Sequence, residues 1–289
     1  MQFVLQTLVG GVGMGAIYVL VALGFSLVYR TMGLVNFAHG DIIMVGAYIA
    51  ATFFVSSKLP FFVSMVLAIV ATAVIGLLIE RVLRPLENKD FDLMLIGTIG
   101  FGIMLEAIAI MIWGATGTSV PAPVDGEPFN ILGIFIKRYE VVIVVVATVA
   151  AVVLWLFLDR TKRGMAMQAV AMDYEEATTL GINVGRSNAI AFAIGAGLAA
   201  LAGGLAGPVL YVNPTFGFSL GILGFAAAIL GGFGNIKGAI IGGLGIGVLQ
   251  AFAAGIFQGY ADVAVFVVFA VIVVIRPTGI FGESTVNRA

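Results

Sequence analysis

The chain has 289 residues, of which 61% are hydrophobic and only 10% are charged, and its formal net charge is −1. A soluble domain is about 45–50% apolar and about 25% charged, so these values exclude a surface that faces water throughout and indicate an integral membrane protein. The lack of cysteine excludes disulfides and thiolate metal sites, and a single histidine excludes a histidine-rich metal site.

Nine apolar segments are predicted to be membrane-spanning helices, because about 20 apolar residues cross a hydrocarbon core of about 30 Å. We therefore expect an all-α polytopic helical bundle of about nine spans (8–10), forming a single transmembrane domain over residues 1–289. The first segment lacks the basic start of a signal peptide and is expected to be retained, and the Gly-rich seventh is expected to be broken or partial. The predicted spans are 8–29, 33–54, 61–80, 93–113, 140–158, 188–208, 217–234, 238–257 and 261–275.

The basic residues predict an orientation. When the loop 159–187 is placed in the cytoplasm and the spans alternate, 11 of the 14 Lys and Arg residues fall inside, an excess typical of the positive-inside rule. The N-terminus is then expected outside and the C-terminus in the cytoplasm. The residues placed inside are Arg30, Arg81, Arg84, Lys89, Arg160, Lys162, Arg163, Arg186, Lys237, Arg276 and Arg288, and those placed outside are Lys58, Lys137 and Arg138.

Glycines recur four residues apart within several spans. Small residues at this spacing let helix backbones approach closely, so we expect a tightly packed bundle. The pairs are Gly11 and Gly15, Gly203 and Gly207, Gly238 and Gly242, and Gly243 and Gly247.

The second span begins with "MGLVNFAHGDIIMVGAY", which places Asn36, His39 and Asp41 among apolar residues near its cytoplasmic end. On a continuous helix Asn36 and His39 share a face, whereas Asp41 points elsewhere and is placed to cap the helix or to pair with Arg30. One histidine without cysteine disfavours a metal site, and a catalytic His–Asp pair lacks a suitable nucleophile. Two interpretations stay open: a polar cluster that fixes an irregular helix start, and a part of the gate or translocation path.

Glu106 lies well inside the fourth span, in "GIMLEAIAIMIW". A charge buried in a span is costly unless it is paired or hydrated, so we expect Glu106 to face the bundle or a water-filled path. A neutral glutamate that joins helices by hydrogen bonds and a residue with a role in transport are both compatible with this position.

The loop 159–187 is the longest and most charged cytoplasmic segment. Residues 165–180 contain no Gly or Pro and are predicted to form one helix, which Gly181 stops. We expect an apolar stripe of Ala169, Met172, Ala177 and Leu180, beside an acidic patch of Asp173, Glu175 and Glu176. Such a segment is either a solvated linker or a docking helix for a groove on a soluble partner.

The stretch "YVNPTFGFSLGI" separates the sixth and seventh spans. Asn213 and Pro214 end one span, and bare amides at the next helix start are suited to a substrate carboxylate near the outer mouth. The alternative is a simple turn. Asn213 is therefore a candidate residue of the translocation path.

Several motifs occur in the order typical of the branched-chain amino acid permease family, and the resemblance covers about residues 8–282. The short N-terminus and the Asn-Phe-Ala-His-Gly motif resemble the LivH-type subunit rather than the longer LivM-type one. "EEATTLG" resembles the Glu-Ala…Gly loop of bacterial ABC-importer permeases, which carries the coupling helix; the chain departs from the common pattern at Met165, Met167 and Gln168. The motifs are "GLVNFAHGDIIMVGAY", "ERVLRPL", "TKRGMA", "LGINV", "LYVNPTFGF", "AAILGGFGNIKGAIIGG" and "RPTGIFG".

The resemblance implies a type II-like permease subunit of an ATP-driven importer for branched-chain or related amino acids, in the bacterial cytoplasmic (inner) membrane. It implies a second homologous permease, two cytoplasmic ATPase subunits and an extracytoplasmic binding protein as partners, with no nucleic acid. Alternating access would be driven by ATP and Mg²⁺ bound in the ATPases, because this chain has no Gly-Lys dipeptide and hence no P-loop. The implied ATPase-coupling residues are Asp173, Glu175, Glu176, Ala177 and Gly181, and the gate or path candidates are Asn36, His39, Asp41, Glu106 and Asn213.

On this interpretation the chain is not an enzyme and holds no cofactor or metal. Three alternatives remain at this stage. They are a permease of a urea or short-amide importer, a stand-alone secondary transporter or channel, and an intramembrane enzyme.

Overall fold

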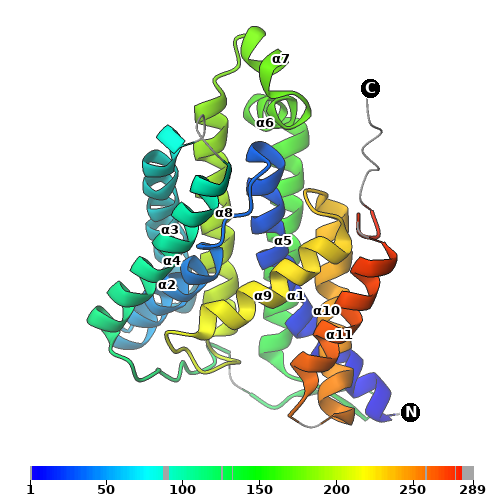
Figure 1. Cartoon of the computed structure of the whole chain (residues 1–289). Coiled ribbons are helices and arrows are strands. Elements are labelled where there is room, and N and C mark those ends of the chain that lie inside the picture. The colour runs from blue at the N-terminus through cyan, green and yellow to red at the C-terminus, as the bar shows by residue number, and fades with distance from the viewer. Residues whose placement is uncertain are drawn as a thin grey trace.

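The computed structural model describes residues 2–86, 91–124, 126–131, 133–257, 259–276 and 278–281. Nine apolar helices in this part of the chain coincide with the nine predicted segments, so the prediction of an all-helical polytopic membrane protein is confirmed (Figure 1). Seven of them are long and apolar enough to cross a membrane, whereas α9 and α11, of 16 and 15 residues, are shorter. The nine are α1 (Gln2–Met32), α2 (His39–Ala51), α3 (Phe61–Leu83), α4 (Phe91–Trp113), α5 (Arg138–Arg160), α8 (Val184–Ala206), α9 (Phe216–Gly231), α10 (Ile236–Ile256) and α11 (Ala261–Ile275).

Helix α1 lies at the centre of the bundle, in contact with α5, α8, α9 and α10. Its residues from Gly15 to Val28 are all buried. On this helix Gly11 and Gly15 face Gly247 and Gly243 of the antiparallel α10, and a Cβ on Gly15 would lie 3.2 Å from the carbonyl oxygen of Gly243. The expected close packing of small residues therefore joins these two helices.

The other two glycine pairs differ in whether both members pack against another helix. Gly238 and Gly242 both pack on the backbone of α9, at Gly231 and Ala227. Gly203 packs on Ile43 of α2, whereas its partner Gly207 follows the end of α8 and lies against Val212 of the connection to α9. Only the first member of that pair thus mediates helix packing.

The second predicted span begins six residues later than expected. Residues 33–38 are not helical, and α2 starts at His39 before passing into a π-helical turn over Thr52–Ser56. The short α2 packs against α3, α4, α8 and α9. The apolar pattern of residues 33–38 predicted a helix, but tertiary packing holds this segment in an irregular conformation.

Helices α3, α4 and α5 lie at the periphery and leave large apolar side chains exposed, including Val70, Met111 and Val153. In a membrane such side chains face lipid at no cost. Before α5 the chain forms a hairpin of β1 (Phe129–Ile131) and β2 (Ile134–Ile136), which the sequence did not predict. Gln6 of α1 holds this hairpin by bonds in both directions to the backbone of Phe135.

Helices α6 (Lys162–Met172) and α7 (Tyr174–Thr179) project from one end of the bundle, opposite the N-terminus of α1 (Figure 1). They form the middle of the predicted cytoplasmic loop 159–187. Lys89 and Arg288, two of the basic residues behind the predicted orientation, lie outside the described residues.

Candidate functional site

The segment 162–181, here called the coupling region, is exposed over much of its length. It consists of α6, Asp173, α7, Leu180 and Gly181. The single helix predicted over 165–180 is wrong, because the backbone of Asp173 is extended, with φ −155° and ψ 115°. The Asp173 carboxylate instead caps α7 by accepting a hydrogen bond from the Glu176 N–H, at 2.8 Å. Local capping thus outcompetes continuation of the helix.

The coupling region buries a different face from the one predicted. Val170, Ala177 and Val184 form a small apolar cluster at its base. Met172 and Leu180, assigned by the sequence to the apolar stripe with Ala169 and Ala177, are 83% and 79% exposed. The break at Asp173 changes the helical phase, so the four residues do not share one face.

The exposed side of the coupling region combines acidic and apolar groups. Glu175 and Glu176 are exposed in the first turn of α7, beside Tyr174, Met172 and Leu180. Exposed apolar side chains outside the spans, flanked by charges, are typical of a protein–protein contact surface.

Gly181 ends α7 as the sequence predicted. Its φ of +80° is readily adopted by glycine. The N–H of Gly181 donates to the Thr178 carbonyl and the N–H of Ile182 to the Ala177 carbonyl, each at 3.0 Å. These bonds satisfy carbonyls at the helix end and direct the chain into α8.

The coupling region contacts the spanning helices α1, α5 and α8. Gln168 of α6 donates to the Leu158 carbonyl of α5 at 2.8 Å, and a Cβ on Gly164 would collide with the backbone of Leu158. Arg84, after α3, forms a two-bond ion pair with Glu80 and donates to the Gly185 carbonyl of α8 at 2.9 Å. The α6 and α7 helices also contact α8, and α6 contacts α1. A displacement of the coupling region therefore acts directly on α1, α5 and α8, and it reaches α3 through the bond between Arg84 and α8.

The start of α2 lies deeper in the bundle than predicted. The His39 ring rests on Gly24, where a Cβ would lie 2.5 Å from its Cε1 atom, and its centroid is 4.4 Å from that of Phe25. Gly24 precedes the end of α1 at Met32 by eight residues, or about 12 Å. His39 is therefore packed inside the bundle, about two helical turns from the end of α1.

Asn36 and His39 do not share a helical face, because Asn36 lies in the irregular segment before α2. The Asn36 side-chain oxygen accepts from the Ala38 N–H at 3.1 Å, and its carbonyl accepts from the His39 N–H at 3.1 Å. Both residues are buried. This geometry is that of a polar cluster which fixes a helix start.

Asp41 and Glu106 face each other across α2 and α4. The Asp41 carboxylate touches α4 at Gly102, and Glu106 lies four residues further along that helix, close enough to interact with Asp41 electrostatically. The predicted pairing of Asp41 with Arg30 is not formed, since the ion pair of the described residues is Arg84–Glu80. Asp41 and Glu106 are both half-buried, as expected of a glutamate that faces the bundle.

A cavity of about 280 Å³, here called the outer pocket, lies between α1, α9, α10, α11 and the connection that holds Asn213. Asn213 accepts a hydrogen bond from the Thr215 hydroxyl at 2.8 Å, and α9 begins next to them without a side-chain cap. The cavity is on the side of the bundle away from the coupling region.

Three residues of the outer pocket were not predicted from the sequence. Tyr18 donates to the Gln250 side-chain oxygen, and the Gln250 amide donates to Asp262 at 2.8 Å. Gln250 was detectable as the single polar residue of the apolar stretch 239–257, and Asp262 as an acid at a span start. What the sequence did not show is that they meet.

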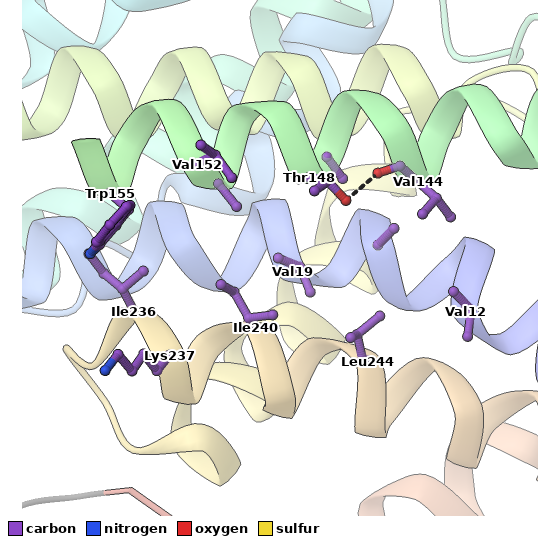
Figure 2. A pocket seen from close by; sticks show the side chains of 13 residues that line it. Val12, Val19, Val144, Thr148, Val152, Trp155, Ile236, Lys237, Ile240 and Leu244 are labelled. Atoms are coloured by element: carbon purple, nitrogen blue, oxygen red, sulfur yellow. Dashed lines mark hydrogen bonds between the residues drawn. The ribbon is translucent and has the colours of Figure 1, made fainter. Parts of the chain in front are cut away.

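A larger cavity of about 420 Å³ opens along α1 between α5 and α10 (Figure 2). Its lining is mostly aliphatic, Lys237 lies at one end near Trp155, and the Thr148 hydroxyl is bonded to the Val144 carbonyl at 2.7 Å. This groove offers no acidic group to an ammonium ion and presents an apolar surface. Among the described residues no group of three or more His, Cys, Asp or Glu side chains is placed to hold a metal ion.

Comparison with known proteins gives full-length matches. A family model described as "Branched-chain amino acid transport system / permease component" matches residues 7–276. The high-affinity branched-chain amino acid transport system permease protein BraD of Pseudomonas aeruginosa is 37% identical over 98% of this chain and 97% of that protein. The corresponding protein LivH of Salmonella typhimurium is 34% identical over 99% of this chain and 98% of its own length.

A second permease type of the same transport system is also similar. LivM of Salmonella typhimurium is 27% identical over 77% of this chain, but only 58% of LivM is covered. The similarity to BraD and LivH is therefore both higher and more complete.

Proposed function

The chain belongs to the branched-chain amino acid transport permease family, as a multi-pass LivH/BraD-type permease component and not an enzyme, and on this premise we propose that it conducts branched-chain amino acids inward through an ATP-driven importer. The relatives named above are described as high-affinity branched-chain amino acid permeases. ATP and Mg²⁺ are bound by other subunits, and this chain holds no cofactor.

The coupling region is the observation that carries the proposal. Its exposed Met172, Leu180 and Glu176 lie outside the spans, where a soluble ATPase subunit has access to them. In the proposal Asp173, Glu175, Glu176, Ala177 and Gly181 form the docking element: Ala177 anchors α7 on the bundle, Gly181 shapes its end, and the acids face the partner.

Movement then passes from the ATPase to the spans through fixed contacts. A rigid displacement of the coupling region pulls on α5 through Gln168 and on α8 through the Val184 cluster, and α8 is bonded to α3 through Arg84. Closure of two ATPases around ATP thereby changes the tilt of three spanning helices together, which is the step that alternating access requires.

The partners follow from the same proposal. The similarity to LivM makes a second permease of that type the expected neighbour in the membrane, with two ATPases at the coupling region and a substrate-binding protein at the opposite face. The N-terminus then lies outside and the coupling region in the cytoplasm, in the bacterial inner membrane. The gate or path candidates Asn36, His39, Asp41, Glu106 and Asn213 keep that role as proposals.

The test is leucine uptake into proteoliposomes by the assembled importer that carries Glu175→Lys with Glu176→Lys. We expect uptake to fall roughly 30-fold, the effect of losing about 2 kcal/mol at an interface hot spot. The permease itself should stay folded, because Glu175 and Glu176 are both exposed.

The matched control is Glu127→Lys, an exposed acid between α4 and α5 on the other face of the bundle. Its uptake should equal that of the wild type. Unchanged uptake in the double variant would overturn the coupling assignment, and leucine uptake by this chain alone would overturn the importer.

A further inference from the structure

Both polar and apolar side chains line the outer pocket. Tyr18, Gln250 and Asp262 are joined by hydrogen bonds and are here called its polar end. Phe216, Leu220 and Leu223 are its apolar lining residues from α9 and are here called the α9 wall, and further polar groups line the pocket at Asn213, Thr215 and Ser219. These three wall residues are all buried and thus held in place by the bundle. A ligand of this cavity therefore meets both polar groups and fixed aliphatic and aromatic side chains.

Hydrogen bonds give the polar end a defined direction. The buried Tyr18 hydroxyl donates to the Gln250 oxygen, which obliges the Gln250 amide group to act as donor toward Asp262 Oδ1. Within the described part of the chain, no hydrogen bond or ion pair uses Asp262 Oδ2. The exposed carboxylate is therefore oriented through one oxygen and keeps the other available.

The charge of the lining selects the polar group of the ligand. Asp262 is the charged side chain among the described residues that line the pocket. A carboxylate repels a phosphate or an isolated carboxylate and attracts an ammonium group, to which it forms charge-assisted hydrogen bonds. A bare Ca²⁺ or Mg²⁺ ion requires about six or more oxygen ligands, which one carboxylate and a committed amide do not provide.

We propose that the outer pocket is a substrate subsite in which Asp262, oriented by Gln250 and Tyr18, receives the ammonium group of an aliphatic α-amino acid while its side chain lies along the α9 wall. This inference rests on the proposed function and assigns to it the residues that receive the substrate on the outer face. The cavity of about 280 Å³ is of a size for one small molecule.

The test uses the complete importer, with leucine as the probe at a concentration below saturation. Asp262→Asn keeps the shape but removes the charge, and we expect uptake to fall roughly 10- to 100-fold, the effect of one charge-assisted hydrogen bond. Gln250→Leu should cause a smaller loss of roughly 3- to 10-fold, because it removes only the orienting group. Asp262→Glu should recover part of the uptake. Basal ATP hydrolysis and co-purification of the ATPases should not change.

The matched control is Glu140→Gln, an acid in the first turn of α5 at the same face of the bundle and outside the pocket lining. It should transport as the wild type does. A wild-type importer that hydrolyses ATP but takes up no leucine would overturn the proposed function, whereas wild-type rates in both Asp262→Asn and Gln250→Leu would overturn the subsite alone.

A second variant covers the case in which Asp262→Asn does not assemble. Ser219→Leu, at an exposed position of α9 in the pocket lining, fills the cavity without touching the hydrogen bonds. Uptake should again fall at least tenfold. Wild-type uptake in this variant would equally overturn the proposal.

Discussion

The start of α2 and the coupling region are both polar interruptions of an apolar chain, yet their side chains face opposite environments. Asn36 and His39 are 2% and 1% exposed. Glu175 and Glu176 of α7 are exposed, and Met172 and Leu180 beside them are apolar and exposed as well. In the first region the Asn36 side chain bonds the neighbouring backbone and the His39 ring packs on Gly24 and Phe25 of α1. The second region leaves these four polar and apolar side chains exposed rather than packed inside the bundle.

This difference separates stability from coupling. A buried polar group contributes to folding through the bonds it makes, and its loss leaves a partner unsatisfied. An exposed side chain contributes little to folding, so its replacement changes the binding of a partner instead. Variants of the two regions should therefore affect different measurements.

The largest effect is expected where His39 meets α1. Gly24→Leu places a side chain against the imidazole, whose Cε1 atom would lie 2.5 Å from the new Cβ, and overpacking of this kind costs about 3 kcal/mol. Thermal unfolding in detergent should show a clearly lower Tm than for Gly10→Leu on the same helix, where a Cβ meets nothing within 4 Å. Equal Tm values would mean that the α2 start is loosely packed.

An intermediate effect is expected from the exposed apolar residues of α6 and α7. Met172→Asp with Leu180→Asp should weaken ATPase binding about 30-fold, or about 2 kcal/mol. The Tm of the isolated permease should not change, because both side chains are at least 79% exposed. Titration of the detergent-solubilised permease with its ATPase measures the first quantity.

The control for that variant is Ile131→Asp, an exposed apolar position of the β1–β2 hairpin at the other face. It should bind the ATPase normally. A drop in Tm with unchanged ATPase binding in the α6–α7 variant would reverse the distinction between the two regions.

The smallest effect concerns Asn36. Asn36→Ala removes the acceptor of the buried Ala38 N–H, which should lower the free energy of unfolding by about 1 kcal/mol. Asn130→Ala removes a similar bond, to the Gly133 N–H at 3.0 Å, in an exposed loop and should cost less than about 0.5 kcal/mol. Denaturant unfolding in detergent compares the two variants. An equal loss of unfolding free energy in both would mean that burial of the Asn36 bond does not increase its contribution to stability.

Some errors of the sequence analysis were avoidable. Asp173 followed by Glu176 three residues later is a helix-start pattern, and the acid at N-cap bonds the Glu176 N–H as that pattern predicts. Residues 165–180 were taken as one helix because they lack Gly and Pro. The capping signal was local and readable, and with it the exposed positions of Met172 and Leu180 would have been expected.

Other errors were not avoidable from the sequence. Asp41 meets Gly102 and Glu106 rather than Arg30, because α4 packs beside α2 and presents a glycine there. Residues 33–38 are as apolar as a spanning segment, but they are not helical. Both outcomes depend on which helices become neighbours, which local pattern does not specify.

By itself the sequence determined where the nine apolar helices lie, that the chain is a polytopic membrane protein, and where its polar connections fall. These features are local, since an uninterrupted apolar run of sufficient length must satisfy its backbone as a helix in lipid. Only the tertiary structure decided the depth of His39, the contacts of the coupling region with α1, α5 and α8, and the meeting of Tyr18, Gln250 and Asp262. Those features join residues up to 244 positions apart (Tyr18 to Asp262, 262 − 18), and close helix packing through glycines brings them together.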